Sequence, residues 1–390
     1  MSALPMDSME VVAPAESRSF TSDNTAGGAP EIIAAVAAAA SGQAPPYGTD
    51  SWTSSAQRRF GEIFECDVDL LPVSTGSAAN ALSLATLTPP WGSVLCHRDS
   101  HINNDECGAP EFFSGGAKLI ALGGENAKID ADELQAAVHR KVGDVHSVQP
   151  CVLSLTQATE TGGVYTPAEI GHLACIAKHA GLRVHMDGAR LANAVTALGC
   201  HPAELTWRAG VDMLSFGAIK NGSITADAIV VFDRSLTTAL SFRAKRAGQL
   251  AAKMRFAAAQ LDAYLADDLW LRNARHANAM TTRLEEGLKS IVGTRLAGTP
   301  EANILFCRLP EQVINGLLDQ GYGFYHDRWQ PGVVRFVTSF ATTTHDVDQL
   351  VHAVRRLSAA AIEDSRRKRA RTQRSGSGRR SEVACMGRVR

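Results

Sequence analysis

Residues 184–190 decide the fold, and their sequence is VHMDGAR. An apolar run leads into Asp187, and a glycine and Arg190 follow within three residues. A carboxylate buried at the end of a strand needs a cationic partner, because an unpaired buried charge is costly. A protonated pyridine nitrogen would satisfy Asp187, and so would a local ion pair with Arg190 in a turn. The pattern alone leaves both interpretations open.

A second stretch of the same kind lies one strand–helix–strand step later, at residues 214–222, LSFGAIKNG. Lys220 follows an apolar strand and stands among small residues. A lysine held in a dry pocket can lose its proton and form a Schiff base with an aldehyde cofactor. A surface lysine in a loop is the more common explanation of one such residue. The pairing of Lys220 with Asp187 on neighbouring strand ends favours the chemical interpretation.

The third stretch is STGS at residues 74–77, between a predicted strand and a predicted helix. A glycine lets a ligand approach the backbone, and hydroxyls with helix N-terminal amides bind phosphate. Thr75, Gly76 and Ser77 are therefore candidate phosphate ligands, although the same pattern is also an ordinary helix cap. A phosphate cradle, a carboxylate and a lysine on consecutive strand ends form the set that pyridoxal 5'-phosphate (PLP) requires.

Outward from these stretches, short β-branched runs alternate with helical segments, which predicts an α/β fold with a mostly parallel sheet covered by helices. Such sheets bind ligands at the carboxyl ends of their strands. The predicted strands are Val68–Val73, Ser93–His97, Lys118–Leu122, Val152–Thr156, Arg183–Met186, Met213–Phe216 and Ala228–Phe232. The predicted helices are Asn80–Leu87, Asp130–Val142 and Pro167–Gly181, with Asp130 and Thr166 as N-caps.

The chain divides into five predicted regions. We expect a disordered leader (1–19), a large cofactor-binding domain with an N-terminal arm (20–250), linking helices (251–290), a small α+β C-terminal domain (291–362) and a basic disordered tail (363–390). In the small domain, Asn303–Arg308 and Val333–Thr338 are predicted strands, and Glu311–Gln320 and Thr344–Ala361 are predicted helices.

Composition narrows the class of protein. The 390 residues carry a net charge of −1, but residues 365–390 hold ten Arg or Lys and one acidic residue, so the rest of the chain is acidic. Nucleic acid is therefore an expected partner of the tail at most, and a solvated extension is the favoured interpretation. No apolar run is long enough to predict a membrane span. The eight scattered cysteines fit reduced thiols of a cytoplasmic protein.

Seven motifs occur in collinear order between Phe20 and Leu357, two of them within the stretches already described, and together they resemble the low-specificity L-threonine aldolases, a group of fold-type I PLP enzymes. The motifs are FTSDN (20–24), YGTDSWT (47–53), DECGAPEFF (105–113), HMDGAR (185–190), PAELTW (202–207), KNG (220–222) and GQLAAKMRF (248–256). The resemblance implies a large PLP-binding domain, a smaller C-terminal domain, and a homo-oligomer, a dimer of dimers with shared active sites.

The resemblance also implies roles for single residues. Lys220 would hold PLP covalently, Asp187 would keep the pyridine nitrogen protonated, and His101 would stack on the ring and handle the proton of the β-hydroxyl group. Further residues would bind cofactor or substrate. They are Thr75, Gly76, Ser77 and Arg255 at the phosphate, Arg190 at cofactor and substrate, Arg335 at the substrate carboxylate, Ser22 at substrate or phosphate, and Tyr47 in the site, contributed by a neighbouring subunit.

The predicted activity is the cleavage of L-threonine, L-allo-threonine and related β-hydroxy-α-amino acids to glycine and an aldehyde. Two alternatives stay open: another fold-type I PLP enzyme, either a β-eliminating lyase or an aminotransferase, and an inactive scaffold that acts through its tail. The chain departs from the family pattern at Ile219, where Thr or Ser is usual. No metal site is expected, because His97 and His101 lack the glutamate of an H-E-x-x-H motif.

Overall fold

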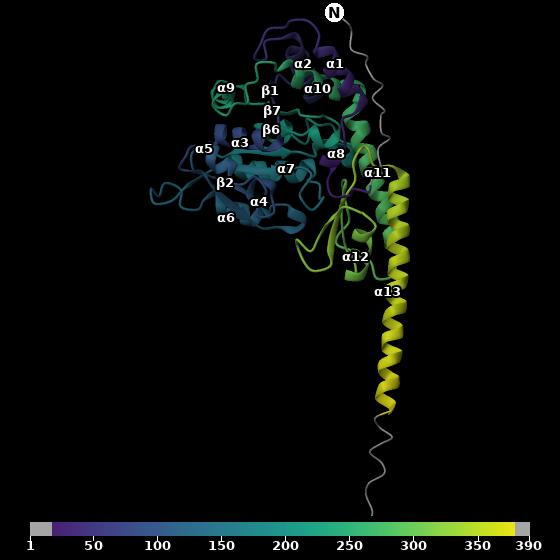
Figure 1. The fold of residues 1–390 in the computed structure, drawn as a ribbon. Coiled ribbons are helices and arrows are strands. Elements are labelled where there is room, and N and C mark those ends of the chain that lie inside the picture. The colour runs from purple at the N-terminus through teal and green to yellow at the C-terminus, as the bar shows by residue number, and fades with distance from the viewer. Residues whose placement is uncertain (1–17, 379–390) are drawn as a thin grey trace, which may run out of the picture.

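The computed structural model describes residues 18–378 of the chain. A seven-stranded sheet forms the centre of a large domain, and a four-stranded sheet belongs to a smaller one beside it (Figure 1). In spatial order, the large sheet contains β1 (Asp69–Val73), β7 (Asp227–Val231), β6 (Met213–Phe216), β5 (Arg183–Gly188), β4 (Gln149–Thr156), β2 (Gly92–His97) and β3 (Lys118–Leu122). The small sheet contains β10 (Tyr325–His326), β11 (Val333–Val337), β9 (Ile304–Arg308) and β8 (Arg295–Leu296).

Helices pack against both sheets. The α-helices are α1 (Pro30–Ala39), α2 (Ser51–Phe64), α3 (Gly76–Leu87), α4 (His101–Asn104), α5 (Ala109–Ser114), α6 (Ala131–Val138), α7 (Pro167–His179), α8 (Leu191–Leu198), α9 (Thr237–Arg246), α10 (Arg255–Leu265), α11 (Leu269–Lys289), α12 (Glu311–Asp319) and α13 (Thr344–Gly378). Short 3-10 helices lie between them at η1 (Asp23–Thr25), η2 (Glu125–Ala127), η3 (Trp207–Ala209), η4 (Ile219–Asn221), η5 (Arg234–Leu236) and η6 (Ala266–Asp268).

The strand directions confirm the predicted sheet. The pairs β2–β3, β2–β4, β4–β5 and β5–β6 are parallel, and β7 runs antiparallel to both β6 and β1. Apolar residues of α3 and α9 cover one face of the sheet, and those of α6, α7, α8 and α10 cover the other. The sheet is therefore buried on both faces, which explains the near-continuous apolar runs of its strands.

Local signals set the helix ends. Asp130 accepts hydrogen bonds from the amides of Asp132 and Glu133, and Thr166 forms a capping box with Glu169, so both predicted N-caps are confirmed. The helix after Asp130 is shorter than predicted, since it ends at Val138 rather than at Val142. The backbone leaves the helical region just beyond this end, where Lys141 has a φ of 53°.

The N-terminal arm joins the small domain instead of the large sheet. Ser19 forms a β-bridge with Gly323, and the amide of Val337 on β11 donates to the carbonyl of Phe20. Phe20 is buried in the core of the small domain. Arg18 and Ser19, assigned to a disordered leader from the sequence, are thus part of the fold, and residues 1–17 lie outside the described residues. This arm carries Ser22 and Asp23 to the junction of the two domains.

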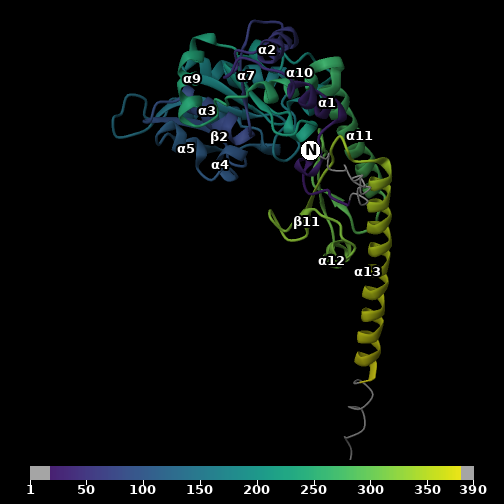
Figure 2. The same cartoon turned by 45° about the horizontal axis from the view of Figure 1, so that its top comes forward.

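The prediction of a disordered tail is wrong for residues 363–378. Helix α13 continues through them to Gly378 and extends beyond the small domain (Figures 1 and 2). Arg, Lys and Ala favour helix, and ion pairs one turn apart, Arg367–Glu363 and Lys368–Asp364, add to this preference. Residues 379–390 lie outside the described part of the chain. Within residues 18–378, no helix is long and apolar enough to cross a membrane.

Candidate active site

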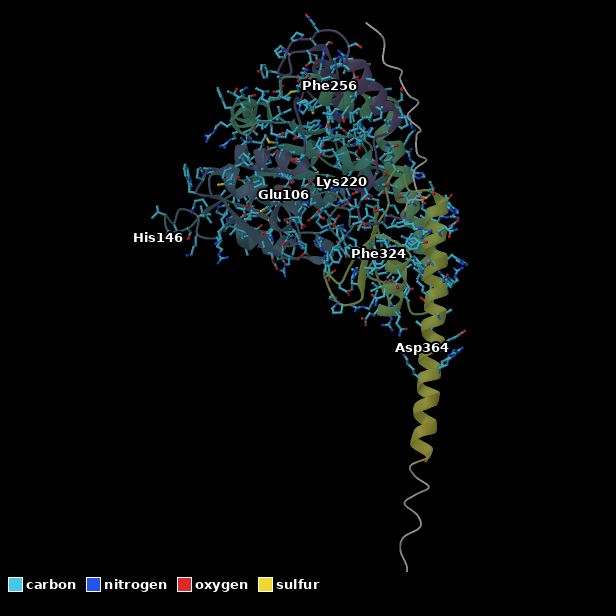
Figure 3. The ribbon with its side chains drawn as sticks, in the orientation of Figure 1. Glu106, His146, Lys220, Phe256, Phe324 and Asp364 are labelled. Atoms are coloured by element: carbon cyan, nitrogen blue, oxygen red, sulfur yellow. The ribbon has the colours of Figure 1, made fainter. Side chains whose placement is uncertain are left out.

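The carboxyl ends of the parallel strands open into a cavity of about 260 Å³. Segments following β1, β2, β5 and β6 meet there, as the strand-end pattern predicted. Six of the predicted site residues line it, namely Thr75, Gly76, Ser77, His101, Asp187 and Lys220. Sequence reasoning did not single out Asn24, Asn80, Glu106, Glu160, Ala189, Gly217 and Asp227, which complete the lining together with Ile219. Figure 3 places Glu106 and Lys220 near the middle of the large domain.

The start of α3 forms an anion-binding corner of this cavity. Thr75 is the N-cap, and its hydroxyl accepts a hydrogen bond from the amide of Ala78 (3.0 Å). The amides of Gly76 and Ser77 donate to no group in the described residues. Free amides at the positive end of a helix dipole attract a phosphate, and the lack of a side chain at Gly76 keeps the approach open. The corner therefore fits the phosphate of PLP.

Asp187 is the buried carboxylate at the end of β5, with 3% of its surface exposed. One oxygen accepts from the side-chain amide of Asn80 (2.9 Å) and the other from the backbone amide of Ala189 (3.0 Å). These neutral donors fix the carboxylate without neutralising its charge. A protonated ring nitrogen would supply the missing cation, so Asp187 fits the pyridine of the same cofactor.

His101 is tied to a second buried carboxylate, that of Glu106. Nδ1 of His101 lies 2.8 Å from Oε1 of Glu106, and the same oxygen accepts from the side-chain amide of Asn80. The hydrogen bond to Glu106 is the largest cause that raises the pKa of His101, and burial opposes it. Because Nδ1–H donates to Glu106, Nε2 is the nitrogen free to accept a proton from a substrate. Position 106 lies in the DECGAPEFF motif, which could have drawn attention to it.

Lys220 stands in a turn that is fixed from two sides. Oδ1 of Asp227 accepts from the amides of Ala218 (2.7 Å) and Ile219 (3.0 Å). On the other side, the side chain of Asn221 donates to the hydroxyl of Tyr264 (2.6 Å) and to the carbonyl of Trp270 (2.8 Å). Lys220 forms no ion pair in the described structure. Its amine is therefore available for a covalent bond to an aldehyde.

Arg190 lies behind the cavity rather than in its lining. Its Nε and Nη2 donate to the two oxygens of Asp23 at 2.7 and 2.9 Å, and both residues are buried. Burial opposes the ionisation of Asp23, but the charges of Arg190 and Lys220 outweigh it and lower the pKa of Asp23. Asn303 of the small domain also donates to Asp23. The sequence left open a local ion pair between Asp187 and Arg190. In the structure, Arg190 instead pairs with Asp23, which is distant from it in the sequence.

Arg335 approaches from β11 of the small domain. Its guanidinium lies 4.8 Å from the ring centroid of Tyr325 and 5.6 Å from that of Trp329, and its Nη2 donates to the carbonyl of Thr21. Its Nε is buried without a hydrogen-bond partner in the described residues. Burial lowers the pKa of Arg335, and the nearby charge of Arg190 adds to this effect. A cation with an unused donor fits the carboxylate of an amino acid.

Besides Arg190 and Arg335, three more predicted residues do not line the cavity of this protomer. Ser22 caps η1, where its hydroxyl accepts from the amide of Asn24. Tyr47 is 47% exposed under the amine of Lys245, and Arg255 donates to the carbonyl of Gly42. Within the described residues, no group of three or more His, Cys, Asp or Glu is arranged to hold a metal ion.

Comparisons with known proteins agree with this geometry. Residues 19–309 match the family described as beta-eliminating lyase. The low specificity L-threonine aldolase of Pseudomonas aeruginosa is 43% identical over 86% of this chain and 96% of its own, and that of a Pseudomonas sp. is 41% identical over 88% and 99%. The structure of Leishmania major threonine aldolase matches with a TM-score of 0.81 and 28% identity, covering 87% of this chain and 99% of that one. The resemblance and the fold expected from the sequence are confirmed, and the chain belongs to the beta-eliminating lyase family, in its low-specificity L-threonine aldolase group.

Proposed function

We propose that this chain cleaves threonine-type β-hydroxy-α-amino acids to glycine and an aldehyde, with PLP as its cofactor. The observation that carries the proposal is the convergence of Lys220, Asp187 and the free amides of Gly76 and Ser77 on one cavity. When bound, PLP supplies an electron sink for the pair released by the breaking Cα–Cβ bond. The family relatives act on L-threonine by name, which supports the same substrate class here.

Residues of the large domain hold and tune the cofactor. Lys220 would hold PLP covalently through its amine, and the free amides at the start of α3 would hold its phosphate. Asp187, fixed by Asn80 and Ala189, keeps a proton on the ring nitrogen. Asp187 would therefore act on the rate of cleavage as well as on cofactor binding.

His101 handles the proton of the β-hydroxyl group. Cleavage requires this proton to leave as the aldehyde forms, and Nε2 of His101 accepts it. The carboxylate of Glu106 stabilises the resulting imidazolium and fixes the ring through Nδ1. Glu106 therefore acts through His101.

Arg335 holds the carboxylate of the substrate and sets its orientation. Orientation decides the reaction, since it selects which bond of the bound amino acid is broken. Arg190 uses two of its N–H groups on Asp23, so a contact of Arg190 with cofactor or substrate involves its remaining N–H groups. Ser22 lies two residues from the cavity-lining Asn24 and is assigned to the substrate side.

The assembly is proposed to be a dimer of dimers in the cytoplasm, with active sites shared between subunits. Tyr47 and Arg255 support this proposal because neither lines the cavity of its own protomer. Three exposed aromatic side chains, Trp91, Phe112 and Phe113, supply apolar surface for a second copy. In the shared arrangement, Tyr47 and Arg255 complete the site of a neighbour.

The reaction is tested by the product. Purified protein with PLP should release glycine and acetaldehyde from both L-threonine and L-allo-threonine. The family description also covers β-elimination, and that chemistry would release ammonia and a keto acid instead. A protein that binds PLP and produces only a keto acid would replace the aldolase proposal with this second candidate.

A further inference from the structure

Asp227 is a buried carboxylate to which the proposed reaction assigns no role. It is the first residue of β7, it is 6% exposed, and it lines the cavity. Because β7 runs antiparallel to β6 and β1, its first residue lies at the edge where those strands end. In the pairing with β1, Asp227 stands opposite Val73, just before the STGS stretch.

One oxygen of Asp227 binds the turn that carries Lys220. Oδ1 accepts from the amides of Ala218 and Ile219, the two residues that precede the lysine. The residue before Lys220 is Ile219, whose side chain has no hydroxyl group and cannot form a hydrogen bond. On the N-terminal side of Lys220, the turn is therefore held by the two backbone hydrogen bonds to Asp227. With Asn221 bonded behind, the direction of the Lys220 side chain is set by this turn.

The other oxygen faces the phosphate corner. A Cβ placed on Gly76 would lie 3.6 Å from Oδ2, so this oxygen stands beside the first turn of α3. No hydrogen bond to Oδ2 occurs in the described structure. Asp227 thus lies between the two loops that are proposed to hold PLP, one at its aldehyde end and one at its phosphate end.

The charged and titratable groups facing Asp227 come from three elements. Lys220 in η4 favours the ionised carboxylate, and Asp187 on β5 opposes it. The buried phenol of Tyr264 on α10 also lies close enough to be affected by the charge of Asp227. Burial is the largest cause that raises the pKa of Asp227, and the bonds from Ala218, Ile219 and the charge of Lys220 work against it.

We infer that Asp227 is a positioning residue that fixes the Lys220 turn through Oδ1 and places a negative charge next to the covalent link between Lys220 and PLP. This inference rests on the proposed use of PLP at Lys220. The bonds of Oδ1 should keep the cofactor attached, and the charge should favour the protonated form of the link.

The test compares Asp227→Ala with Asp227→Asn in full-length protein loaded with PLP. The first readout is the rate at which PLP dissociates, and the second is the pH midpoint of the absorbance change of bound PLP. Alanine removes the acceptor of two amides, so PLP should dissociate at least about ten times faster. Asparagine keeps an acceptor oxygen and should restore slow dissociation, but its neutral side chain should move the midpoint to lower pH by about half a unit or more.

Asp212→Asn is the matched control. Asp212 is also largely buried and accepts from a backbone amide, that of Val184, but it precedes β6 and lies at the opposite end of the sheet strands. It should change thermal stability without moving either PLP readout. A shift of the midpoint as large as that of Asp227→Asn would show a general effect of lost charge and overturn the inference.

The outcomes separate the inference from the proposed function. If borohydride reduction of the wild type does not trap PLP on Lys220, both fail. If the wild type traps PLP and the two Asp227 variants match it in both readouts, the inference alone fails. If Asp227→Ala does not fold, Asp227→Asn decides, because an unchanged midpoint in that variant contradicts the assigned charge.

Discussion

The site combines two clusters of charged and polar side chains that are built in different ways. The sheet-edge cluster consists of Lys220, Asp187, His101 and Glu106, all within the large domain. The domain-junction cluster consists of Asp23, Arg190, Asn303 and Arg335, which come from the N-terminal arm, the end of β5 and the small domain. The first cluster is held by neighbours within one domain, whereas the second depends on how two domains meet.

The difference indicates a division of labour. A rigid sheet edge suits a cofactor that stays in place through many turnovers. A junction of two domains suits a substrate that must enter and leave, because small movements of the domains change the distance between its charges. We therefore expect substitutions in the sheet-edge cluster to affect the cofactor and those in the junction cluster to affect the substrate.

The largest effect should follow from Lys220→Ala. Loss of the amine removes the covalent attachment of PLP, so turnover should fall by more than about a thousandfold. The absorbance of protein-bound PLP should change at the same time. Product assays and a spectrum of the purified variant check both expectations. Cleavage at the wild-type rate would show that Lys220 has been assigned wrongly and would remove the basis for the comparison.

Arg335→Ala should show the opposite pattern. Removing charged hydrogen bonds to the substrate carboxylate should raise KM between about tenfold and a hundredfold, and the spectrum of bound PLP should stay unchanged. Arg335→Lys is the control, since lysine keeps the positive charge but lacks the planar guanidinium group that bonds a carboxylate twice. Its KM should lie between that of the wild type and that of Arg335→Ala. Steady-state kinetics with L-threonine measure the effect. Loss of PLP from the Arg335→Ala variant would show that Arg335 does not belong to the domain-junction cluster.

The two clusters also differ in how far the sequence predicts them. Asp187 stands at the end of one apolar strand and Lys220 in the turn after another, and the strand-end rule placed them in one cavity. Asp227 was missed because the strand-end rule looks for residues at the carboxyl ends of strands. Strand β7 is antiparallel to its neighbours, so its first residue, Asp227, lies at the edge where their carboxyl ends are. The ion pair of Arg190 was not predicted because its partner Asp23 lies far away in the sequence, and only tertiary packing brings the two together. The tail helix was missed because composition predicts solvation without excluding local helix.

A smaller effect, on pH dependence, should follow from Glu106→Gln. The wild-type His101 has a raised pKa, so it becomes neutral and able to accept a proton only at higher pH. Glutamine removes the charge that stabilises the imidazolium, so the pKa of His101 should fall. The acid limb of the kcat profile should then move to lower pH by up to about one unit.

Glu160→Gln provides the comparison for this shift. Glu160 lines the same cavity and raises the pKa of His101 through its charge, but no hydrogen bond joins the two side chains. Its substitution should move the acid limb in the same direction by less. Equal shifts in the two variants would mean that overall charge controls the profile and that the Glu106–His101 bond has no special part in it.

The smallest effect should come from removing residues 369–390, which include most of the basic tail but none of either cluster. The ion pairs Arg367–Glu363 and Lys368–Asp364 stay in the shortened chain. We expect kcat/KM within about twofold of the full-length value and an unchanged PLP spectrum, since the described part of the removed segment, residues 369–378, lies at the end of α13 that extends beyond the small domain (Figure 2). A loss of activity greater than tenfold would show that the tail contributes to an active site, in addition to the sheet-edge and domain-junction clusters.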